Sequence, residues 1–335
     1  MNIAIVILNW NGRHLLEKFV PVVLEHSAEQ ATVYVADNAS TDDSVAFLDE
    51  NFPQVKVIRN TTNGGYAKGY NEALQHLNED LFILMNSDIA TSKGWLGSII
   101  KNFEENPQLG AAQPKILDLK RPDHFEYAGA GGGFLDYFGY PFCRGRLFDT
   151  LEKDQGQYDD TLPVFWASGA CLVVRKKAFY EAGALDESFF AHQEEIDLCW
   201  RIQAVNYKVY HIGSSQVYHL GGATLEQMNP QKTFLNFRNN LMLLLKNVSG
   251  FRVWGILFLR MCLDGIAAIK FLAQWKSKHC FAIIRAHFAF YSKIGSVLKQ
   301  RRKTPKIRRY SITKSVVWQY FVLGKKYYND ISRNY

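Results

Sequence analysis

Cysteine is scarce in this sequence, and the few cysteines follow no recognisable spacing. The 335-residue chain has five, with no CxxC pair and no metal-binding pattern among them: Cys143, Cys171, Cys199, Cys262 and Cys280. An odd number of scattered cysteines in a long chain favours a reducing compartment over a disulfide framework. The sequence therefore gives no reason to expect a disulfide-stabilised secreted domain.

Long uninterrupted hydrophobic runs are also missing. Phe251–Ala273 is strongly apolar, but Arg260 and Asp264 interrupt it, so it lacks the run of about 18 uncharged residues that a transmembrane helix needs. The first residues, MNIAIVILNWNG, have neither a basic lead nor a small-residue cleavage site. They are typical of a strand rather than a signal peptide. We therefore expect neither a membrane-spanning helix nor a secretion signal.

Acidic residues are nearly absent from the last third of the chain. Residues 1–229 hold 18 Lys+Arg and 30 Asp+Glu, a net charge of −12, whereas residues 230–335 hold 21 Lys+Arg and two acids, a net charge of +19. The two values add up to the +7 of the whole chain. This asymmetry predicts a catalytic body and a basic region that meets an anionic partner.

The first 105 residues alternate between apolar β-rich runs and helical patterns. The expected strands are Ile3–Leu8, Thr32–Ala36, Val55–Ile58 and Leu81–Met85. The expected helices run from about His14 to Glu25, from Thr41 or Asp42 to Asn51, from Tyr66 to Leu77 and from Ser92 to Glu105. Such alternation predicts βαβ units and a parallel sheet.

The pattern loosens after residue 105. Further strands are expected at Ala111–Leu117, Cys171–Val174, Lys208–Ile212 and Gln216–His219. Helices are expected from Lys176 onward and over Glu194–Val205. Gly129–Gly133 and Asp136–Asp160 are predicted to be loops, because glycines or mixed aromatic and charged residues interrupt any periodicity.

The basic region 230–335 contains two helical patterns. In the first, Phe251–Ala273, the polar residues fall within an arc of about 120°, and the remaining face is apolar. The polar residues are Arg252, Arg260, Asp264, Lys270 and Gln274. This predicts an amphipathic helix that lies in a membrane interface or packs on a partner. A second helix is expected at Ile283–Leu298.

A cluster of six basic residues in nine, RRKTPKIRR, occupies positions 301–309. Beside amphipathic helices such a cluster indicates binding to anionic lipid. Nucleic acid is the less favoured partner, because the apolar helices beside the cluster would not contribute to binding it. A solvated basic linker remains the alternative.

Polar residues gather where the expected strands end: Asn9 and Asn11, Asp37 and Asn38, Asn86 and Asp88. Open α/β sheets bind ligands at this edge. A carboxylate at Asp37 can accept hydrogen bonds from a ribose or a base, and the glycine-rich loop with Gly65 and Lys68 offers backbone N–H groups. A dinucleotide-binding protein would carry GxGxxG after its first strand, where this chain has NWNGRH, so a Rossmann dehydrogenase is disfavoured.

Seven segments in order resemble the family 2 glycosyltransferases of GT-A fold, in particular their rhamnosyltransferase-like branch. They are ILNWNG, VADNASTDDS, NGGYAKGYNEAL, LMNSD, SGACLVVRKKAF, GALDESFFAHQEEIDLCWR and VYHLGG. The resemblance covers about residues 1–240. It implies an inverting transfer from a nucleoside-diphosphate sugar on a mostly parallel α/β sheet, with a nucleotide-binding half and an acceptor half.

The resemblance also implies a metal site. The family uses a DxD motif, a divalent metal such as Mg²⁺ or Mn²⁺ and often a later histidine. Here the motif is Asn86-Ser87-Asp88, which makes Asp88 a metal ligand and Asn86 a ribose or phosphate contact. His219 matches the position of the metal-binding histidine, although a structural role is the alternative interpretation.

The resemblance assigns the catalytic base to Glu195, with Glu194 as second candidate. A solvated helix start, where carboxylates suit the helix dipole, is the alternative. Asp197 and Arg201 are expected to form an i, i+4 ion pair.

The remaining predictions concern the surroundings of that base. Trp166, Ser168 and Gly169 are predicted to line the acceptor side, and Phe189 and Phe190 to be core residues. Arg238 could contact the diphosphate or begin the membrane-facing region.

We therefore predict a GT-A domain at residues 1–229, with a nucleotide-sugar-binding half at 1–110 and an acceptor half at 111–229. Residues 230–335 are predicted to be a membrane-associating helical region. The predicted activity is transfer of a sugar, with rhamnose as the candidate, to a lipid-linked or polysaccharide acceptor. The predicted location is cytoplasmic, on the inner face of the membrane, with no nucleic-acid partner.

Two other functions compete with this one. A nucleotide-sugar-binding scaffold in a synthesis complex is the second hypothesis, because the motif has one carboxylate fewer than the family pattern. A nucleotidyltransferase ranks third, because the loop after the first strand has only Arg13 and one glycine.

Overall fold

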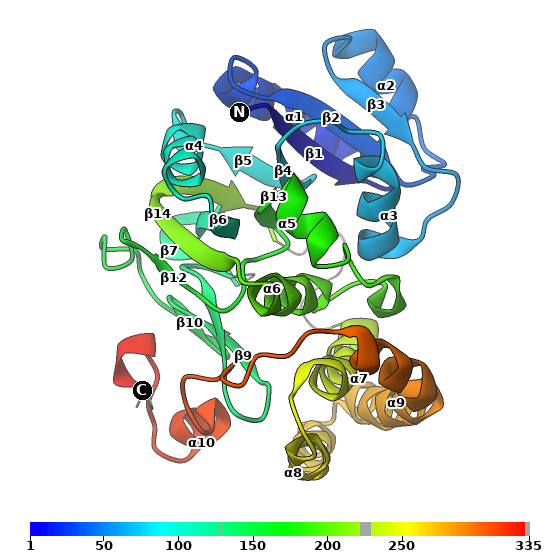
Figure 1. The fold of residues 1–335 in the computed structure, drawn as a ribbon, viewed down its shortest axis with the longest axis vertical. Coiled ribbons are helices and arrows are strands. Elements are labelled where there is room, and N and C mark those ends of the chain that lie inside the picture. Colours follow the sequence, from blue (N-terminus) through cyan, green and yellow to red (C-terminus); the bar gives the residue numbers. More distant parts are fainter. Residues whose placement is uncertain (128, 222–228, 332–335) are drawn as a thin grey trace.

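The computed structural model describes residues 1–127, 129–221 and 229–331 (Figure 1). A central sheet of ten strands runs through the molecule, in the order β12-β14-β6-β13-β4-β1-β2-β3, with β5 and β7 attached to β14 and β6. The last glycine of the VYHLGG segment, Gly222, lies outside the described residues.

The N-terminal half of the sheet is parallel, as the alternating pattern predicted. Its strands are β1 (Ile3–Asn9), β2 (Thr32–Asp37), β3 (Lys56–Arg59) and β4 (Leu81–Asn86). The register pairs Asn9 with Asp37 and Leu8 with Asn86. The strand ends therefore meet at one edge of the sheet, where the polar residues were expected.

The second half of the sheet is mixed. Its long strands are β6 (Leu109–Asp118), β13 (Cys171–Arg175) and β14 (Lys208–His219), and its short ones are β5 (Ile89–Thr91), β7 (Arg121–Phe125) and β12 (Thr161–Pro163). Strand β13 runs antiparallel to both β4 and β6 and joins the two halves. The two strands predicted at 208–212 and 216–219 are one strand with an irregularity between Ile212 and Gln216.

Residues 136–160, predicted to be a loop, contain short strands, so that prediction was wrong. A separate four-stranded sheet consists of β8 (Gly133–Leu135), β9 (Pro141–Cys143), β10 (Arg146–Leu147) and β11 (Thr150–Leu151). Strands of two or three residues are too short to give a periodic pattern. Gly133 is needed here because a Cβ at that position would lie 1.9 Å from the Trp166 ring.

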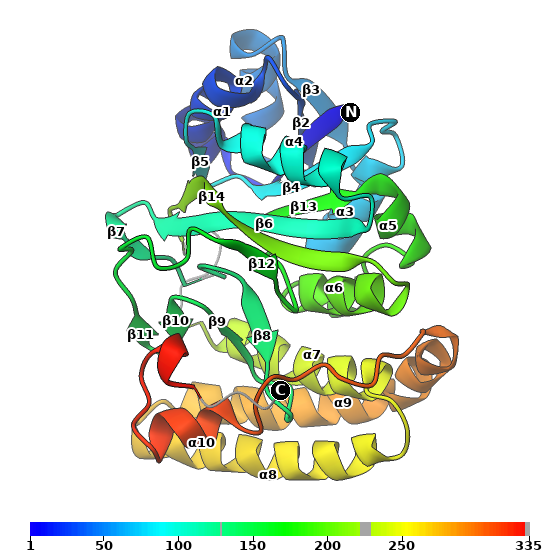
Figure 2. The ribbon, with the colours of Figure 1, turned by 60° about the vertical axis from the view of Figure 1, so that its left-hand side comes forward.

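Helices cover both faces of the central sheet (Figure 2). Alternate residues of β1 face opposite sides, so Ile5 packs in one hydrophobic cluster and Val6 in the other. The first cluster includes residues of α1 (Arg13–Ser27), α2 (Ser44–Asn51) and α4 (Trp95–Glu105). The second includes residues of α3 (Gly65–Leu74), α5 (Lys176–Glu181), the 3₁₀ helix η1 (Glu187–Phe189) and α6 (Glu194–Ala204).

The basic region folds as helices that pack on the body rather than as an extended tail. They are α7 (Pro230–Asn247), α8 (Arg252–Ala273), α9 (Ser277–Lys303), α10 (Val316–Phe321) and the 3₁₀ helix η2 (Tyr328–Asp330). Lys246 of α7 lies 2.9 Å from Asp197 of α6, and Tyr310 stacks on Trp200 with ring centroids 4.7 Å apart. The predicted domain boundary at residue 229 stays a prediction. In the described ranges, no helix combines the length and apolarity that crossing a membrane requires.

Candidate active site

The pairing of two strands brings Asp88 and His219 together. Asp88 follows β4, and the next residue, Ile89, pairs with His219 at the end of β14. The His219 Nε2 atom lies 3.0 Å from Asp88 Oδ1, and both side chains are buried. Two residues that are 131 positions apart in sequence thus meet at the sheet edge, as the metal-site prediction requires.

Glu126 is a third residue that contacts this pair, and it is not among the site residues predicted from the sequence. Its carboxylate lies 3.1 Å from His219 Nδ1, so the imidazole stands between two carboxylates. Burial lowers the pKa of His219, but the hydrogen bonds and charges of Asp88 and Glu126 outweigh it and raise that pKa to about 10. Glu126 follows β7, and the hairpin of β7 with β6 carries it to the site.

Asp37 and its neighbours form a tightly bonded group at the ends of β1 and β2. Asn9 donates a hydrogen bond of 3.1 Å to one Asp37 oxygen, and the Ser40 backbone N–H donates one of 3.0 Å to the other. Asn11, with a φ of +50°, accepts a 2.7 Å bond from the Thr41 backbone N–H. The side-chain amides of Asn9 and Asn11 therefore fix the end of β2 and the segment that follows it, from Asp37 to Thr41, against the end of β1.

Asn38 fixes the glycine-rich loop. Its side-chain NH₂ donates to Asn63 Oδ1 and to the Gly65 carbonyl. Gly65 has a φ of +79°, and a Cβ there would lie 2.5 Å from the Phe190 carbonyl oxygen, so only glycine fits. The Lys68 ammonium lies 3.5 Å from Glu72 at the surface.

Asn86, the residue that replaces a carboxylate of the family motif, is half-buried at the end of β4. Its backbone N–H donates to the Ala170 carbonyl, which ties the NSD motif to the segment around Gly169.

Two neighbouring acids at the start of α6 each keep one carboxyl oxygen without a partner. Within the part of the chain that the structure describes, neither Glu194 Oε2 nor Glu195 Oε2 has a hydrogen-bond partner, although both atoms are buried. Burial raises the pKa of both carboxyls, that of Glu194 also through its charged neighbour, and this outweighs backbone hydrogen bonds that lower the pKa; that of Glu195 rises to about 7. A buried carboxylate oxygen without a partner costs stability, so this pair is a candidate functional site.

Gly169 lies beside this acid pair. A Cβ on Gly169 would stand 3.7 Å from the Glu195 Cβ, and the Tyr66 hydroxyl donates a 2.8 Å bond to the Gly169 carbonyl. Ser168 is buried, and its backbone N–H donates to Gln113.

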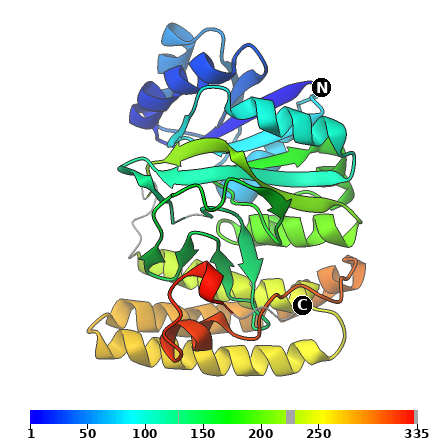
Figure 3. The same ribbon diagram turned by 90° about the vertical axis from the view of Figure 1, so that its left-hand side faces the viewer.

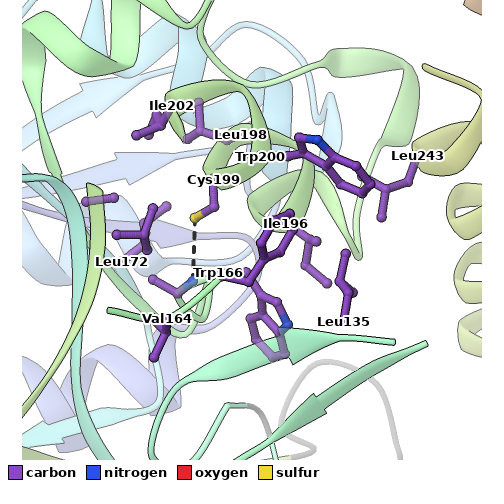
Figure 4. Close-up of a cluster of buried hydrophobic side chains, with 14 of the residues drawn as sticks. Leu135, Val164, Trp166, Leu172, Ile196, Leu198, Cys199, Trp200, Ile202 and Leu243 are labelled. Carbon is purple, nitrogen blue, oxygen red and sulfur yellow. Dashed lines mark hydrogen bonds between the residues drawn. The ribbon is translucent and has the colours of Figure 1, made fainter. Parts of the chain in front are cut away.

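Trp166 belongs to the core rather than to an open surface. It lies among Leu135, Ile196 and other apolar side chains from several elements (Figure 4), and its indole N–H donates to the Phe134 carbonyl. Its predicted role on the acceptor side stays a prediction.

Asp197, two residues beyond Glu195, is bonded to several groups. It forms ion pairs with Arg201 and Lys246, and Asn247 donates a 2.8 Å bond to it. Burial raises its pKa, but the charges of Arg201 and Lys246 lower it more, to about 2. The predicted Asp197–Arg201 ion pair is confirmed.

Helix α7 holds the loop that leads into the acid pair. Asn239 donates to the carbonyls of Phe189, Ala191 and His192, and Arg238 donates to that of Phe189. Positive φ angles at positions 190, 192 and 193 require such support. Sequence reasoning considered Arg238 but not Asn239, whose amide carries no distinguishing motif.

The two phenylalanines of this loop differ. Phe189 is fully buried, as predicted. The prediction that Phe190 is a core residue was wrong, because its φ of +67° turns the side chain outward and leaves it 46% exposed.

The residues at the sheet edge suit a divalent cation of the Mg²⁺ or Mn²⁺ type. Asp88 offers oxygen donors, and His219 Nε2, 3.0 Å from Asp88 Oδ1, becomes a nitrogen donor when a cation displaces the proton that its raised pKa holds there. No group of three or more His, Cys, Asp and Glu side chains within the described ranges is arranged to hold a metal ion. In this arrangement the His219 ring contacts a carboxylate at each nitrogen, so a cation would need further ligands from its substrate or water.

The chain belongs to glycosyl transferase family 2, whose model matches residues 4–181, just over half of its length. It is therefore a glycosyltransferase, and inversion is characteristic of the family. The resemblance stated from the sequence motifs and the GT-A fold class are confirmed.

Two similar sequences are rhamnosyltransferases. The chain is 28% identical over 226 residues to the N-acetylglucosaminyl-diphospho-decaprenol L-rhamnosyltransferase of Mycobacterium tuberculosis, covering 62% of this chain and 72% of the relative. It is 23% identical over 167 residues to the rhamnosyltransferase WbbL of Escherichia coli, covering 47% and 62%.

Two solved structures share the fold. S. aureus TarS (residues 1–349) in complex with UDP-GlcNAc matches with a TM-score of 0.55 at 13% identity, covering 90% of this chain and 92% of that one. The mannosyltransferase PcManGT of Pyrobaculum calidifontis in complex with GDP-Man and Mn²⁺ matches with a TM-score of 0.53 at 14% identity, covering 90% and 82%.

Proposed function

We propose that this protein transfers rhamnose, or a related deoxyhexose, from a nucleoside-diphosphate sugar to a lipid-linked saccharide during cell-surface polysaccharide synthesis. The observation that carries the proposal is that Glu194 and Glu195, side by side, each keep a buried carboxyl oxygen without a hydrogen-bond partner in the described part of the chain. The names of the rhamnosyltransferase relatives support the choice of sugar and acceptor.

Glu195 is the catalytic base in this proposal. It takes the proton of the acceptor hydroxyl while that oxygen bonds to the anomeric carbon and the bond from this carbon to the diphosphate breaks. The electron pair of the broken bond leaves with the diphosphate, and the sugar is inverted. Glu194 is the neighbouring acid, and burial together with the charge of Glu195 raises its pKa well above the usual value.

The donor lies along the sheet edge. Asp37, with Asn9 and Asn38 around it, binds the nucleoside, and the loop with Gly65 and Lys68 faces the phosphates. Asn11 fixes the loop that follows β2 through its bond with Thr41. Asn86 contacts the ribose or a phosphate. The buried hydrogen bonds that fix Asp37 and Asn38 support this arrangement, because they set these groups in place before the donor binds.

Asp88 and His219 would hold a divalent cation. When bound, that cation neutralises the charge that develops on the leaving diphosphate. The Mn²⁺ in the related PcManGT structure supports this assignment, and Glu126 fixes the orientation of the His219 ring. Trp166, Ser168 and Gly169 belong to the acceptor side of the site in this proposal.

A donor screen with the purified full chain tests the proposal. UDP-, dTDP- and GDP-sugars are supplied with a polyprenyl-diphosphate-linked GlcNAc acceptor, and released nucleoside diphosphate is measured with wild type, Asp88→Ala and Glu195→Gln. We expect release with dTDP-rhamnose in the wild type and a large loss in both variants. No release above the Asp88→Ala background with any donor would contradict the proposal.

A scaffold that binds nucleotide sugars without turning them over is the second candidate. The amide at Asn86, where the family motif often has a carboxylate, favours it. Thermal-shift titration with the same nucleotides separates the two candidates, because a scaffold would be stabilised by a donor that it does not consume.

A further inference from the structure

Helix α8 buries two charged residues in its middle and exposes many of its large apolar ones. Arg260 and Asp264 are 4% and 0% exposed, whereas Phe258, Ile266 and Ile269 are 64%, 64% and 68% exposed. These two charged side chains pack on the protein together with smaller apolar ones, whereas the other members of the predicted polar arc, Arg252, Lys270 and Gln274, are exposed. A helix on a water-soluble surface normally exposes its charged side chains and buries its large apolar ones.

The buried charges of α8 have a complete set of partners. Arg260 Nε donates a 2.7 Å bond to Asp264 Oδ1, and His287 of α9 lies 3.2 Å from Asp264 Oδ2. The Arg260 guanidinium also contacts Asn240 of α7 and lies 3.6 Å from the centre of the Tyr140 ring. These contacts fix the rotation of α8, so its apolar face is directed outward by specific bonds.

Helix α8 lies beside α9 and α10 (Figure 3). Tyr291 of α9 contacts Met261 of α8, and Lys270 of α8 lies 4.4 Å from the centre of the Phe321 ring of α10. All three helices and the α8–α9 turn expose large apolar residues: Trp254, Phe258, Leu259, Ile266, Ile269, Leu272, Trp275, Phe281, Ile284, Phe288, Trp318 and Phe321. We call this set the apolar face. The helices α8 and α9, which carry most of it, lie on the side of the molecule away from the central sheet (Figure 2).

Basic residues border the apolar face along the chain. In α9, Arg285 follows Ile284, is exposed, and has its guanidinium 5.3 Å from the Phe234 ring of α7. At the start of α8, a pocket of about 440 Å³ is lined by basic, aromatic and hydroxyl side chains, including Arg252, Arg308 and Arg309. No acidic residue of the described ranges lines that pocket.

Part of the basic cluster at 301–309 has a structural role. Arg301 donates to the carbonyls of Leu245, Val248 and Gly250, and Lys306 donates to that of Lys246. These bonds satisfy carbonyls at and just beyond the C-terminal end of α7. The exposed members of the cluster, Arg302, Lys303, Arg308 and Arg309, remain available at the surface.

We infer that the apolar face docks on an anionic lipid bilayer, with α8 and α9 lying in the interfacial plane. The apolar centre suits the boundary of the acyl chains, and the basic border suits the headgroups. The net charge of +19 on residues 230–335 supports an anionic partner rather than a second copy of this basic surface. The inference concerns the position of the enzyme and does not depend on the identity of donor or acceptor.

Sedimentation with vesicles tests this inference on the full-length protein. Vesicles of phosphatidylcholine alone and of phosphatidylcholine with phosphatidylglycerol are compared. We expect binding to the anionic vesicles that weakens as salt rises. The neutral double variant Phe258→Gln/Ile269→Gln should bind at least about tenfold more weakly, since each exposed side chain loses its apolar burial.

Two further variants separate the contributions. Arg285→Glu/Arg309→Glu should lose the preference for anionic vesicles, whereas Lys101→Glu/Lys177→Glu, with the same charge change on α4 and α5, should keep it. Tyr180→Gln, which removes an exposed aromatic of α5, should also bind as wild type does. Thermal unfolding checks that every variant is folded, and nucleotide release without vesicles checks the transfer reaction independently.

Three results would overturn the inference. The first is a wild type that does not bind anionic vesicles, and the second is an apolar-face variant that binds them as tightly as wild type. The third is a wild-type dimer in solution that Phe258→Gln/Ile269→Gln converts to a monomer while vesicle binding is unchanged, because a second copy would then cover the face.

Discussion

Two groups of buried charges differ in how completely they are paired. In α8, Arg260 and Asp264 bond to each other and to groups of α7 and α9. At the start of α6, Glu194 and Glu195 each keep a buried oxygen without a partner in the described part of the chain. Both groups cost desolvation energy, but only the first recovers it through bonds within the protein.

The pKa values follow the same division. Burial raises the pKa of Asp264, but Arg260 and His287 outweigh it and lower that pKa below its usual value. Burial is the largest influence on the carboxyls of Glu194 and Glu195, and their pKa values rise. The paired charges of α8 therefore have a structural role, whereas those of α6 are the ones that our proposal assigns to the reaction.

The largest expected effect is on activity at the α6 pair. Glu195→Gln should lower kcat by about 10²–10⁴-fold, because general-base catalysis is lost. Thermal stability should not fall, since the amide removes a buried charge. Single-turnover assays with the donor found in the screen measure the rate, and Glu104→Gln on the exposed side of α4 is the control. If the variant keeps a tenth or more of the wild-type rate, Glu195 is not the catalytic base.

The next effect is on stability at α8. Asp264→Ala should lower the free energy of unfolding by about 3–5 kcal/mol, because Arg260 loses its buried partner. The matched control is Asp49→Ala, whose ion pair with Arg59 is exposed and should contribute at most about 1 kcal/mol. Urea unfolding measures both. Equal decreases in the free energy of unfolding of the two variants would show that the buried ion pair of α8 stabilises the protein no more than an exposed one does.

The Glu126–His219 pair allows a test of whether a charge that is paired within the protein also contributes to activity. It contacts His219 rather than substrate, so it is a positioning residue. Glu126→Gln should weaken activation by Mn²⁺ about 10–100-fold, while turnover at saturating metal changes less. A metal titration of nucleotide release gives both values. An unchanged activation midpoint together with a lower melting temperature would assign Glu126 a purely structural role.

Much of this fold could be predicted from the sequence. The strands β1, β2 and β4 have largely apolar runs that end in Asn or Asp, and this pattern alone predicts a parallel sheet with a polar edge. The resemblance to family 2 then singled out Asp88, His219 and Glu195. It did so because the motifs around these residues keep their order along the chain.

Other features could not be predicted, for physical reasons. Glu126 reaches His219 only because β7 folds back on β6, and a pairing of this kind leaves no local pattern. Helical periodicity identified the polar arc of α8 but not that Arg260 and Asp264 within it are buried, since their partners on α7 and α9 decide that. The exposure of Phe190 follows from a left-handed backbone that its residue type does not favour.

The pH dependence of stability tests the central claim most directly. The folded protein holds the proton of the Glu194–Glu195 pair more tightly than the unfolded chain does, with the pKa of Glu195 raised to about 7. This stabilisation is fully present below the usual glutamate pKa and is lost as pH rises through about 7. We therefore predict that Glu195→Gln gains stability relative to wild type between about pH 5 and about pH 8 in urea unfolding. A difference between variant and wild type that does not change with pH would contradict the claim that burial of these carboxyls, with one oxygen of each left without a partner, disfavours their charged form.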